Sequence, residues 1–118
     1  MPNPKKATGD LGERIAEEYL ARQGYVLVAR NFRTRLGEID RIMHNGRYLL
    51  FVEVKARKPG SMVSAEEAVG YRKQQRLRAA AEYYLATHVT DLQPRFDVVC
   101  IDMAADGVSD IRWIENAF

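Results

Sequence analysis

Two carboxylates and a lysine form the pattern that metal-dependent phosphodiester cleavage requires. Glu53 and Lys55 make a Glu-x-Lys motif that directly follows the apolar run 49–52, and Asp40 stands on the preceding predicted strand. Carboxylates hold hard divalent cations while leaving coordination positions for water and for a phosphate oxygen. A lysine beside them orients that water or stabilises the charge that builds on the phosphate. These residue types therefore indicate phosphodiester hydrolysis with Mg²⁺ or Mn²⁺ as the cofactor.

The dipeptide Asn45-Gly46 predicts that these residues lie in the arms of a β-hairpin. It favours a type I′ turn, and apolar stretches over 38–44 and 47–55 flank it. A two-residue turn at this dipeptide makes Asp40 and Glu53 diagonal neighbours on one face of the sheet, with the motif lysine on the same face. Diagonal neighbours lie about 7 to 8 Å apart at the backbone. That separation leaves space for one divalent cation between two carboxylates.

Two interpretations of this charged patch stay open. Like charges on one patch repel and raise each other's pKa, and a bound cation relieves them. In the alternative, Lys55, Arg41 or Arg35 pairs with the acids in an ordinary surface salt-bridge network. The apolar run before Glu53 is typical of an interior strand, and charges at the mouth of such a strand favour the metal site.

The elements that must hold this hairpin are helices and strands in a mixed order. Apolar residues at helical spacing predict a first helix that ends at Gly24. Ser64 and Glu67 have the spacing of a capping box and open a later helical region, which Gly70 divides. In the run 96–102, apolar residues occur at both odd and even positions, as in a strand that is covered on both faces of the sheet. The predicted order is a helix over 10–23, strands over 25–32, 38–44 and 47–55, a helical region over 64–88, and strands over 96–102 and 111–115.

The length and composition favour one domain. A chain of 118 residues, 47% of them hydrophobic, fills a single core without disulfides or structural metals. The order α-β-β-β-α-β-β predicts an α/β fold with a mixed central β-sheet flanked by helices over 1–118, with 1–8 as a flexible tail. One cysteine, Cys100, and two histidines leave only oxygen ligands for a metal. Without a membrane-spanning run or a signal peptide, the expected location is cytoplasmic.

The basic residues are concentrated in the first half of the chain. Residues 1–60 hold 12 Lys and Arg against 7 Asp and Glu, whereas residues 61–118 hold 6 against 9. Clustered basic residues neutralise phosphates if the fold brings them together, and solvated surface faces are the alternative. The predicted nucleic-acid contacts are Arg35, Arg57, Lys58, Arg72, Lys73, Gln74 and Arg76.

Several motifs resemble those of a known family over nearly the whole chain. They are Gly12-Glu13, Tyr19-Leu20, Gly37-Glu38-Ile39-Asp40, Phe51-Val52-Glu53-Val54-Lys55, Lys73 with Arg76-Leu77, and Asn116-Ala117-Phe118. They look like those of the YraN-type family of small bacterial proteins. That family in turn resembles the restriction-endonuclease-like fold of PD-(D/E)xK nucleases, and in particular the archaeal Holliday junction resolvases.

The resemblance implies a role for each matching residue. Asp40 and Glu53 correspond to metal ligands, with the Val54 carbonyl as a third ligand. Lys55 corresponds to the catalytic lysine. Glu13, on the first helix, corresponds to the extra acid that resolvases bring to the metal and to catalysis. For Glu13, a solvated glutamate on the helix face is the alternative.

Three function hypotheses follow. The first is a magnesium-dependent DNA endonuclease that acts on branched or damaged DNA in repair or recombination. The second is a catalytically silent nucleic-acid-binding or accessory protein with the nuclease fold. The third is a partner-binding module that uses Trp113 and the C-terminal aromatic residues, which otherwise serve as core anchors. DNA is the expected partner, a homodimer is one arrangement open to the chain, and no membrane partner is expected.

Overall fold

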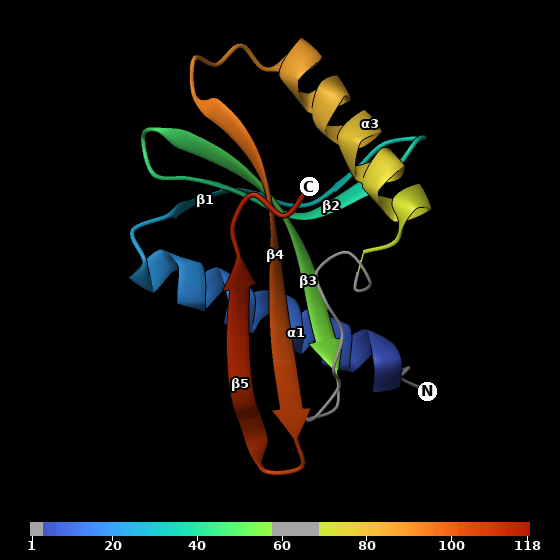
Figure 1. Ribbon diagram of the computed structural model, residues 1–118, viewed down its shortest axis with the longest axis vertical. Helices are drawn as coiled ribbons and strands as arrows, with labels where there is room; N and C mark the ends of the chain where they lie inside the picture. Colours follow the sequence, from blue (N-terminus) through green and yellow to red (C-terminus); the bar gives the residue numbers. More distant parts are fainter. Residues whose placement is uncertain (1–3, 58–68) are drawn as a thin grey trace.

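The computed structural model describes residues 4–57 and 69–118, which form a five-stranded sheet with helices packed against it (Figure 1). The order of the elements confirms the predicted α/β fold with a mixed central sheet flanked by helices. The elements are α1 (Pro4–Arg22), β1 (Val26–Arg33), β2 (Glu38–His44), β3 (Tyr48–Arg57), α3 (Tyr71–Thr87), β4 (Gln93–Ala104) and β5 (Gly107–Ile114).

The sheet has the strand order β1-β2-β3-β4-β5, and β3 is its central strand. All neighbouring strands are antiparallel except β3 and β4, which pair in parallel from Tyr48–Gln93 to Arg57–Asp102. A parallel pair needs a long crossover connection, and the chain between these two strands includes α3. The Glu-x-Lys motif therefore lies on a strand that has neighbours on both sides.

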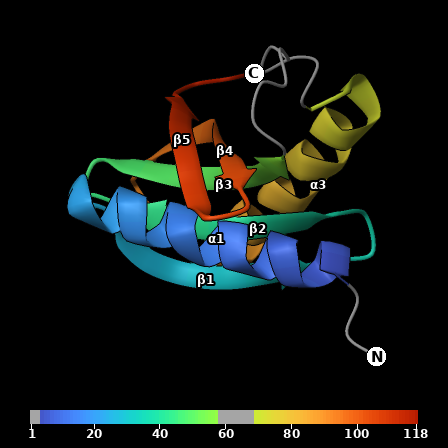
Figure 2. The same ribbon diagram turned by 90° about the horizontal axis from the view of Figure 1, so that it is seen from below.

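Side chains of β3 alternate between two cores, one on each face of the sheet. Leu50 and Val52 pack with Ala16 of α1, whereas Phe51 packs with Leu77 of α3, and all five are buried. Figure 2 shows α1 lying across one face of the sheet and α3 at the other side. The face to which a β3 side chain points therefore decides which helix it meets.

Both helices differ from their predicted bounds. α1 begins at Pro4, so residues 4–8, predicted to be part of a tail, are helical; they carry no large apolar side chain that periodicity could detect. α3 begins at Tyr71, with Gly70 as its N-cap. The predicted capping box of Ser64 and Glu67 lies outside the described residues. Neither of the helices described is long and apolar enough to cross a membrane.

The hairpin of β2 and β3 is confirmed, but its predicted turn is wrong. The Asn45 side-chain oxygen accepts hydrogen bonds from the backbone N–H groups of Arg47 and Tyr48, at 3.0 and 2.8 Å. This Asx-type contact makes Gly46 and Arg47 the central residues, and only Gly46 has a positive φ, of 89°. Every pair of the ladder is thereby shifted by two positions from the predicted register.

Candidate active site

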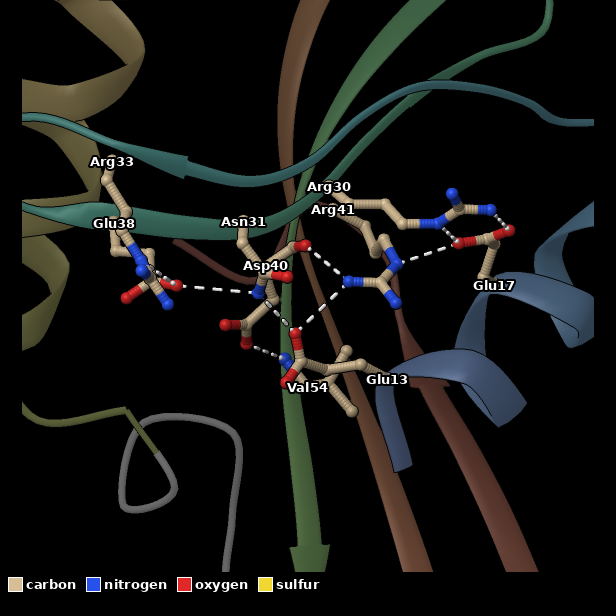
Figure 3. Close-up of polar contacts among 9 residues, drawn as sticks. All are labelled: Glu13, Glu17, Arg30, Asn31, Arg33, Glu38, Asp40, Arg41 and Val54. Atoms are coloured by element: carbon tan, nitrogen blue, oxygen red, sulfur yellow. Dashed lines mark hydrogen bonds and ion pairs between the residues drawn. The ribbon is translucent and has the colours of Figure 1, made fainter. Parts of the chain in front are cut away.

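The shifted register brings Asp40 and Glu53 face to face. Arg41 and Val52 are the last pair of the ladder, and Asp40 and Glu53 are the next residues of the two strands toward the open end of the hairpin. A shift of two preserves the face of each side chain and brings the acids closer than the predicted diagonal arrangement. The backbone N–H of Val54 donates a hydrogen bond of 2.9 Å to Oδ2 of Asp40 (Figure 3). The fold therefore brings the two predicted metal ligands, Asp40 and Glu53, together as an acid pair.

Two lysines reach the carboxylate of Glu53, which is only 2% exposed. Lys73, from the start of α3, places its Nζ 2.5 Å from Oε1 of Glu53, and the Nζ of Lys55 lies 3.6 Å from the same oxygen. Burial and the nearby charge of Lys73 lower the pKa of Lys55. Burial disfavours the charged form of Lys73, but the hydrogen bond with Glu53 and the negative charges of Glu53 and Asp40 together outweigh burial and raise the pKa of Lys73. Lys55 is therefore the lysine that gives up a proton more readily.

Asp40 is short of compensating positive charge. Burial raises its pKa, and the negative charge of Glu53 raises it further, to about 8, although the hydrogen bond from Val54 acts in the opposite direction. The charge of Glu13 also contributes to the rise. Two acids held together in this way need a proton or a cation between them. Strongly shifted carboxyl groups in a groove are typical of functional sites.

Glu13 reaches this region because α1 approaches β3 closely. The approach depends on Gly12, where a Cβ would lie 2.8 Å from the Cβ of Ala56. Oε1 of Glu13 accepts hydrogen bonds from Asn31 at 2.7 Å and from Arg41 at 3.1 Å (Figure 3). The Glu13 side chain is only 14% exposed, so it is not the solvated helix-face residue of the alternative interpretation.

Arg41 links Glu13 and Glu17 of α1 to β2, the strand that carries Asp40. Its guanidinium, 4% exposed, donates to Glu13, to Oε1 of Glu17 at 2.8 Å and to the backbone carbonyl of Asp40 at 2.9 Å. Glu17 is also paired with Arg30, and these hydrogen bonds lower the pKa of Glu17. Arg41 is therefore paired with α1 and not with the carboxylates of the acid pair. The sequence analysis missed Glu17, although its helical spacing from Glu13 places both on one face of α1.

A groove of about 870 Å³ opens over the acid pair, between the β1–β2 turn and the start of α3. The turn and the helix touch at Gly37, where a Cβ would collide with the backbone carbonyl of Arg76. Asp40 and Glu53 line this groove together with five basic residues, so a polyanion can lie across the two acids. The basic lining residues are Arg33, Arg35, Arg72, Lys73 and Arg76.

Two predicted nucleic-acid contacts, Arg57 and Gln74, are not among the described residues that line this groove. Arg57 points toward β4 and forms an ion pair of 3.1 Å with Asp102. The side-chain amide of Gln74 donates to the backbone carbonyl of Val69 at 2.8 Å, which secures the start of α3. Lys58 lies outside the described residues. Arg57 and Gln74 are therefore engaged by partners of their own, and their contact with nucleic acid stays a prediction.

The donor set fits a hard divalent cation only in part. Within residues 4–57 and 69–118, no group of three or more His, Cys, Asp or Glu side chains is arranged to hold a metal ion. Asp40 and Glu53 supply two carboxylates, and a backbone carbonyl, water or a phosphate oxygen is a suitable further ligand for Mg²⁺. Glu13 is engaged by Arg41 and Asn31 and would have to release them to join the set.

A buried aspartate, Asp97, is fully paired and was missed by the sequence analysis. Arg95 donates to both of its oxygens at 2.9 and 2.8 Å, Trp113 donates at 2.8 Å, and the backbone N–H of Asn116 donates at 3.0 Å. The Trp113 ring also meets Tyr25 edge-on, at a centroid distance of 5.7 Å. Trp113 is therefore a core anchor, as one reading of the sequence expected. Asp97 has the donors that Asp40 lacks.

Protonation of Asp40 is expected to stabilise the metal-free fold. Because the pKa of Asp40 is about 8 in the folded protein and about 3.9 in an unfolded chain, the native state keeps a proton that the unfolded state releases. This contribution is complete below about pH 4 and is lost as the pH rises through about 8. The melting temperature of the wild type should fall over this range relative to Asp40→Asn, which cannot titrate. Parallel pH profiles of the two proteins would contradict the assignment.

Together, the mixed sheet, the acid pair and the basic groove define a small α/β protein with a site suited to an anionic ligand. The chain belongs to the uncharacterised protein family UPF0102, whose model matches residues 12–101. The match confirms the family that the motifs indicated.

Proteins of this family resemble the chain over almost its full length. A UPF0102 protein of Alkaliphilus metalliredigens is 43% identical over 96% of this chain and 98% of its own length. One from Clostridium acetobutylicum is 43% identical over 100% of this chain and 98% of its own. One from Symbiobacterium thermophilum is 44% identical, with 96% and 97% covered. The chain therefore corresponds to the whole of these relatives rather than to one part of them.

Proposed function

We propose that this protein is a metal-dependent DNA endonuclease that hydrolyses phosphodiester bonds in branched or damaged DNA, with a restriction-endonuclease-like fold. The observation that carries the proposal is the difference between two aspartates, the buried Asp97 and the half-buried Asp40. Asp97 is surrounded by donors, whereas Asp40 faces a second acid and has a pKa raised to about 8. A fold that pairs the buried Asp97 fully has left Asp40 undercompensated in a basic groove. Undercompensated charge in a groove supports a functional rather than a structural role.

Each residue of the site has a role in this proposal. Asp40 and Glu53 hold Mg²⁺ or Mn²⁺, with the Val54 carbonyl as a further ligand and Glu13 as an additional acid. The bound cation supplies Lewis acidity toward a phosphate oxygen. Lys55, whose lowered pKa suits proton exchange, orients the attacking water and stabilises the charge that develops on the phosphate. Groups from β2, β3 and α1 thus converge on one phosphate position.

The basic residues of the groove supply the phosphate contacts. Arg72 and Arg76 lie on α3, and Arg35 lies in the β1–β2 turn, so the acid pair lies between basic residues of two elements. Contacts of this kind fix the position of a nucleic-acid backbone without reading its sequence. They are expected to make the affinity fall as the salt concentration rises.

One observation favours the second candidate function, a silent nucleic-acid-binding protein. The ammonium groups of Lys73 and Lys55 already flank Oε1 of Glu53. Lysines placed in this way offset the charge of Glu53 without a cation. In this alternative the groove binds DNA through the same arginines and no bond is cleaved.

A cleavage panel separates these functions. Labelled single-stranded, duplex, flapped and four-way DNA is incubated with the wild type, Glu53→Gln and the control Glu82→Gln, with and without Mg²⁺ or Mn²⁺. Glu82 is exposed on α3 and does not line the groove. We expect metal-dependent cleavage by the wild type and the control, and none by Glu53→Gln. Binding without cleavage would overturn the enzyme in favour of the silent protein, and absence of binding would leave the partner-binding module.

A further inference from the structure

A second hollow, of about 810 Å³, adjoins the groove over the acid pair. The two share the residues of the β1–β2 turn, Arg33 to Leu36, and the second hollow adds Tyr83 of α3. Its lining differs in character, because the groove combines acids with basic residues whereas the hollow combines arginines with an aliphatic and an aromatic side chain. A ligand that occupies both must therefore be anionic in one part and apolar and flat in another.

The apolar walls of this hollow are exposed and yet held in place. Leu36 is 66% exposed and Tyr83 is 56% exposed. The ring of Tyr83 packs against Phe32, with their centroids 6.3 Å apart. Thr34 fixes the turn, because its hydroxyl oxygen accepts hydrogen bonds from the N–H groups of Leu36 and Gly37, each at 3.1 Å. Exposed apolar side chains on a fixed support are typical of a binding surface.

We infer that this hollow receives an unpaired nucleobase of the DNA strand whose phosphates lie in the adjoining groove. The inference rests on the proposed function and names its substrate class, which is DNA with unpaired bases near the scissile phosphate. An aromatic face beside arginines is the combination by which proteins bind single strands, since every base offers a flat face for stacking. A base in a duplex is already stacked and paired, so it enters such a hollow only at the cost of unstacking and unpairing, which an unpaired base does not bear.

The substrate in this arrangement spans both hollows. Its phosphate lies over Asp40 and Glu53, the backbone passes Arg33 and Arg35, and the next base rests on Tyr83. The arginines belong to both lining sets, so they contact the backbone at the point where it turns from one hollow into the other. Tyr83 contributes to affinity for strands that carry bases and not to the chemistry.

The test measures binding in metal-free buffer, where the DNA is not cleaved, so the result does not depend on whether the protein is a nuclease. Fluorescence anisotropy compares an oligo-dT strand, an abasic strand of the same length and a duplex, with the wild type, Tyr83→Ala, Tyr83→Phe and Tyr71→Ala. Tyr71 is 75% exposed on the same helix, about 18 Å away along its axis, and lines neither hollow. Melting curves of each variant establish that it is folded.

We expect Tyr83→Ala to lower the affinity for oligo-dT at least about fivefold, the effect of losing one base–aromatic stack. Its affinity for the abasic strand and the duplex should stay unchanged, and Tyr83→Phe and Tyr71→Ala should bind as the wild type does. Unchanged oligo-dT binding by Tyr83→Ala, or an equal loss for all three ligands, would overturn the inference while leaving the proposed nuclease intact. If the wild type binds none of the three, the proposed function and the inference both fail.

Discussion

Replacement of Lys55 by alanine is expected to lower the single-turnover cleavage rate at least about a hundredfold, the size of losing one preorganised electrostatic group. Lys55 follows Glu53 on the same face of β3, and its Nζ lies 3.6 Å from the Glu53 carboxylate. Its side chain is 32% exposed, so its charge acts in a partly desolvated site next to the reacting phosphate. The affinity for DNA should change little, because phosphate binding is distributed over the arginines of the groove.

Arg72→Ala is the matched comparison for this prediction. Arg72 is exposed and lines the same groove, but no interaction links it to the acid pair among the described residues. We expect this variant to bind all DNA sequences more weakly and to lower the slope of log affinity against log salt concentration by about one unit. The cleavage rate of the bound substrate should not change. Similar losses of affinity in both variants, with no specific loss of rate for Lys55→Ala, would contradict a catalytic role for Lys55.

Replacement of Asp97 by alanine is expected to cost about 3 to 5 kcal/mol of unfolding free energy, as when one partner of a buried ion pair is removed. Asp97 is 0% exposed, and without it Trp113 and the backbone N–H of Asn116 lose their acceptor. Arg95 loses its two shortest hydrogen bonds and keeps its contacts with Tyr25 and Glu115. The groups that remain are largely shielded from water, so the penalty of leaving them unpaired is added to the lost contacts.

Urea denaturation of Asp97→Ala and of the control Asp110→Ala measures this difference. Asp110 is exposed on β5 and faces Asp102 across the ladder, so its removal should change stability by no more than about 0.5 kcal/mol. If Asp97→Ala lowers the unfolding free energy as little as the control does, the contacts of Asp97 with Arg95, Trp113 and Asn116 do not hold β4 and β5 together.

That Asp40, Glu53 and Lys55 share one face of the sheet could be predicted even though the predicted strand register was wrong. Side chains alternate with a period of two along a strand, so an error of two positions does not change the face. The predicted turn was wrong and the register was displaced by two positions, yet a displacement of two leaves every side chain on its own face. A displacement of one would have placed Asp40 and Glu53 on opposite faces of the sheet. The sequence pattern therefore predicts that Asp40 and Glu53 lie on the same face of the sheet, but not the distance between their carboxylates.

The partners that arrive from elsewhere in the chain could not be predicted. Lys73 reaches Glu53 from the start of α3, and α3 lies so close to the β1–β2 turn that a Cβ on Gly37 would meet the Arg76 backbone. The pairing of Arg57 with Asp102 depends on the parallel register of β3 and β4, which no local pattern encodes. Long-range packing decides such contacts, whereas periodicity and turn residues report only on neighbours in the sequence.

The central claim is that Asp40 and Glu53 hold a divalent cation, and titration with Mn²⁺ while thermal stability is recorded tests it most directly. A ligand that binds only the native state adds about 2.7 kcal/mol of stability at one hundred times its dissociation constant. We predict this gain for the wild type and for the control Glu82→Gln, and its loss in Asp40→Asn and Glu53→Gln. A wild type whose melting temperature does not respond to Mn²⁺ or Mg²⁺, or an equal response in Glu53→Gln, would contradict the account.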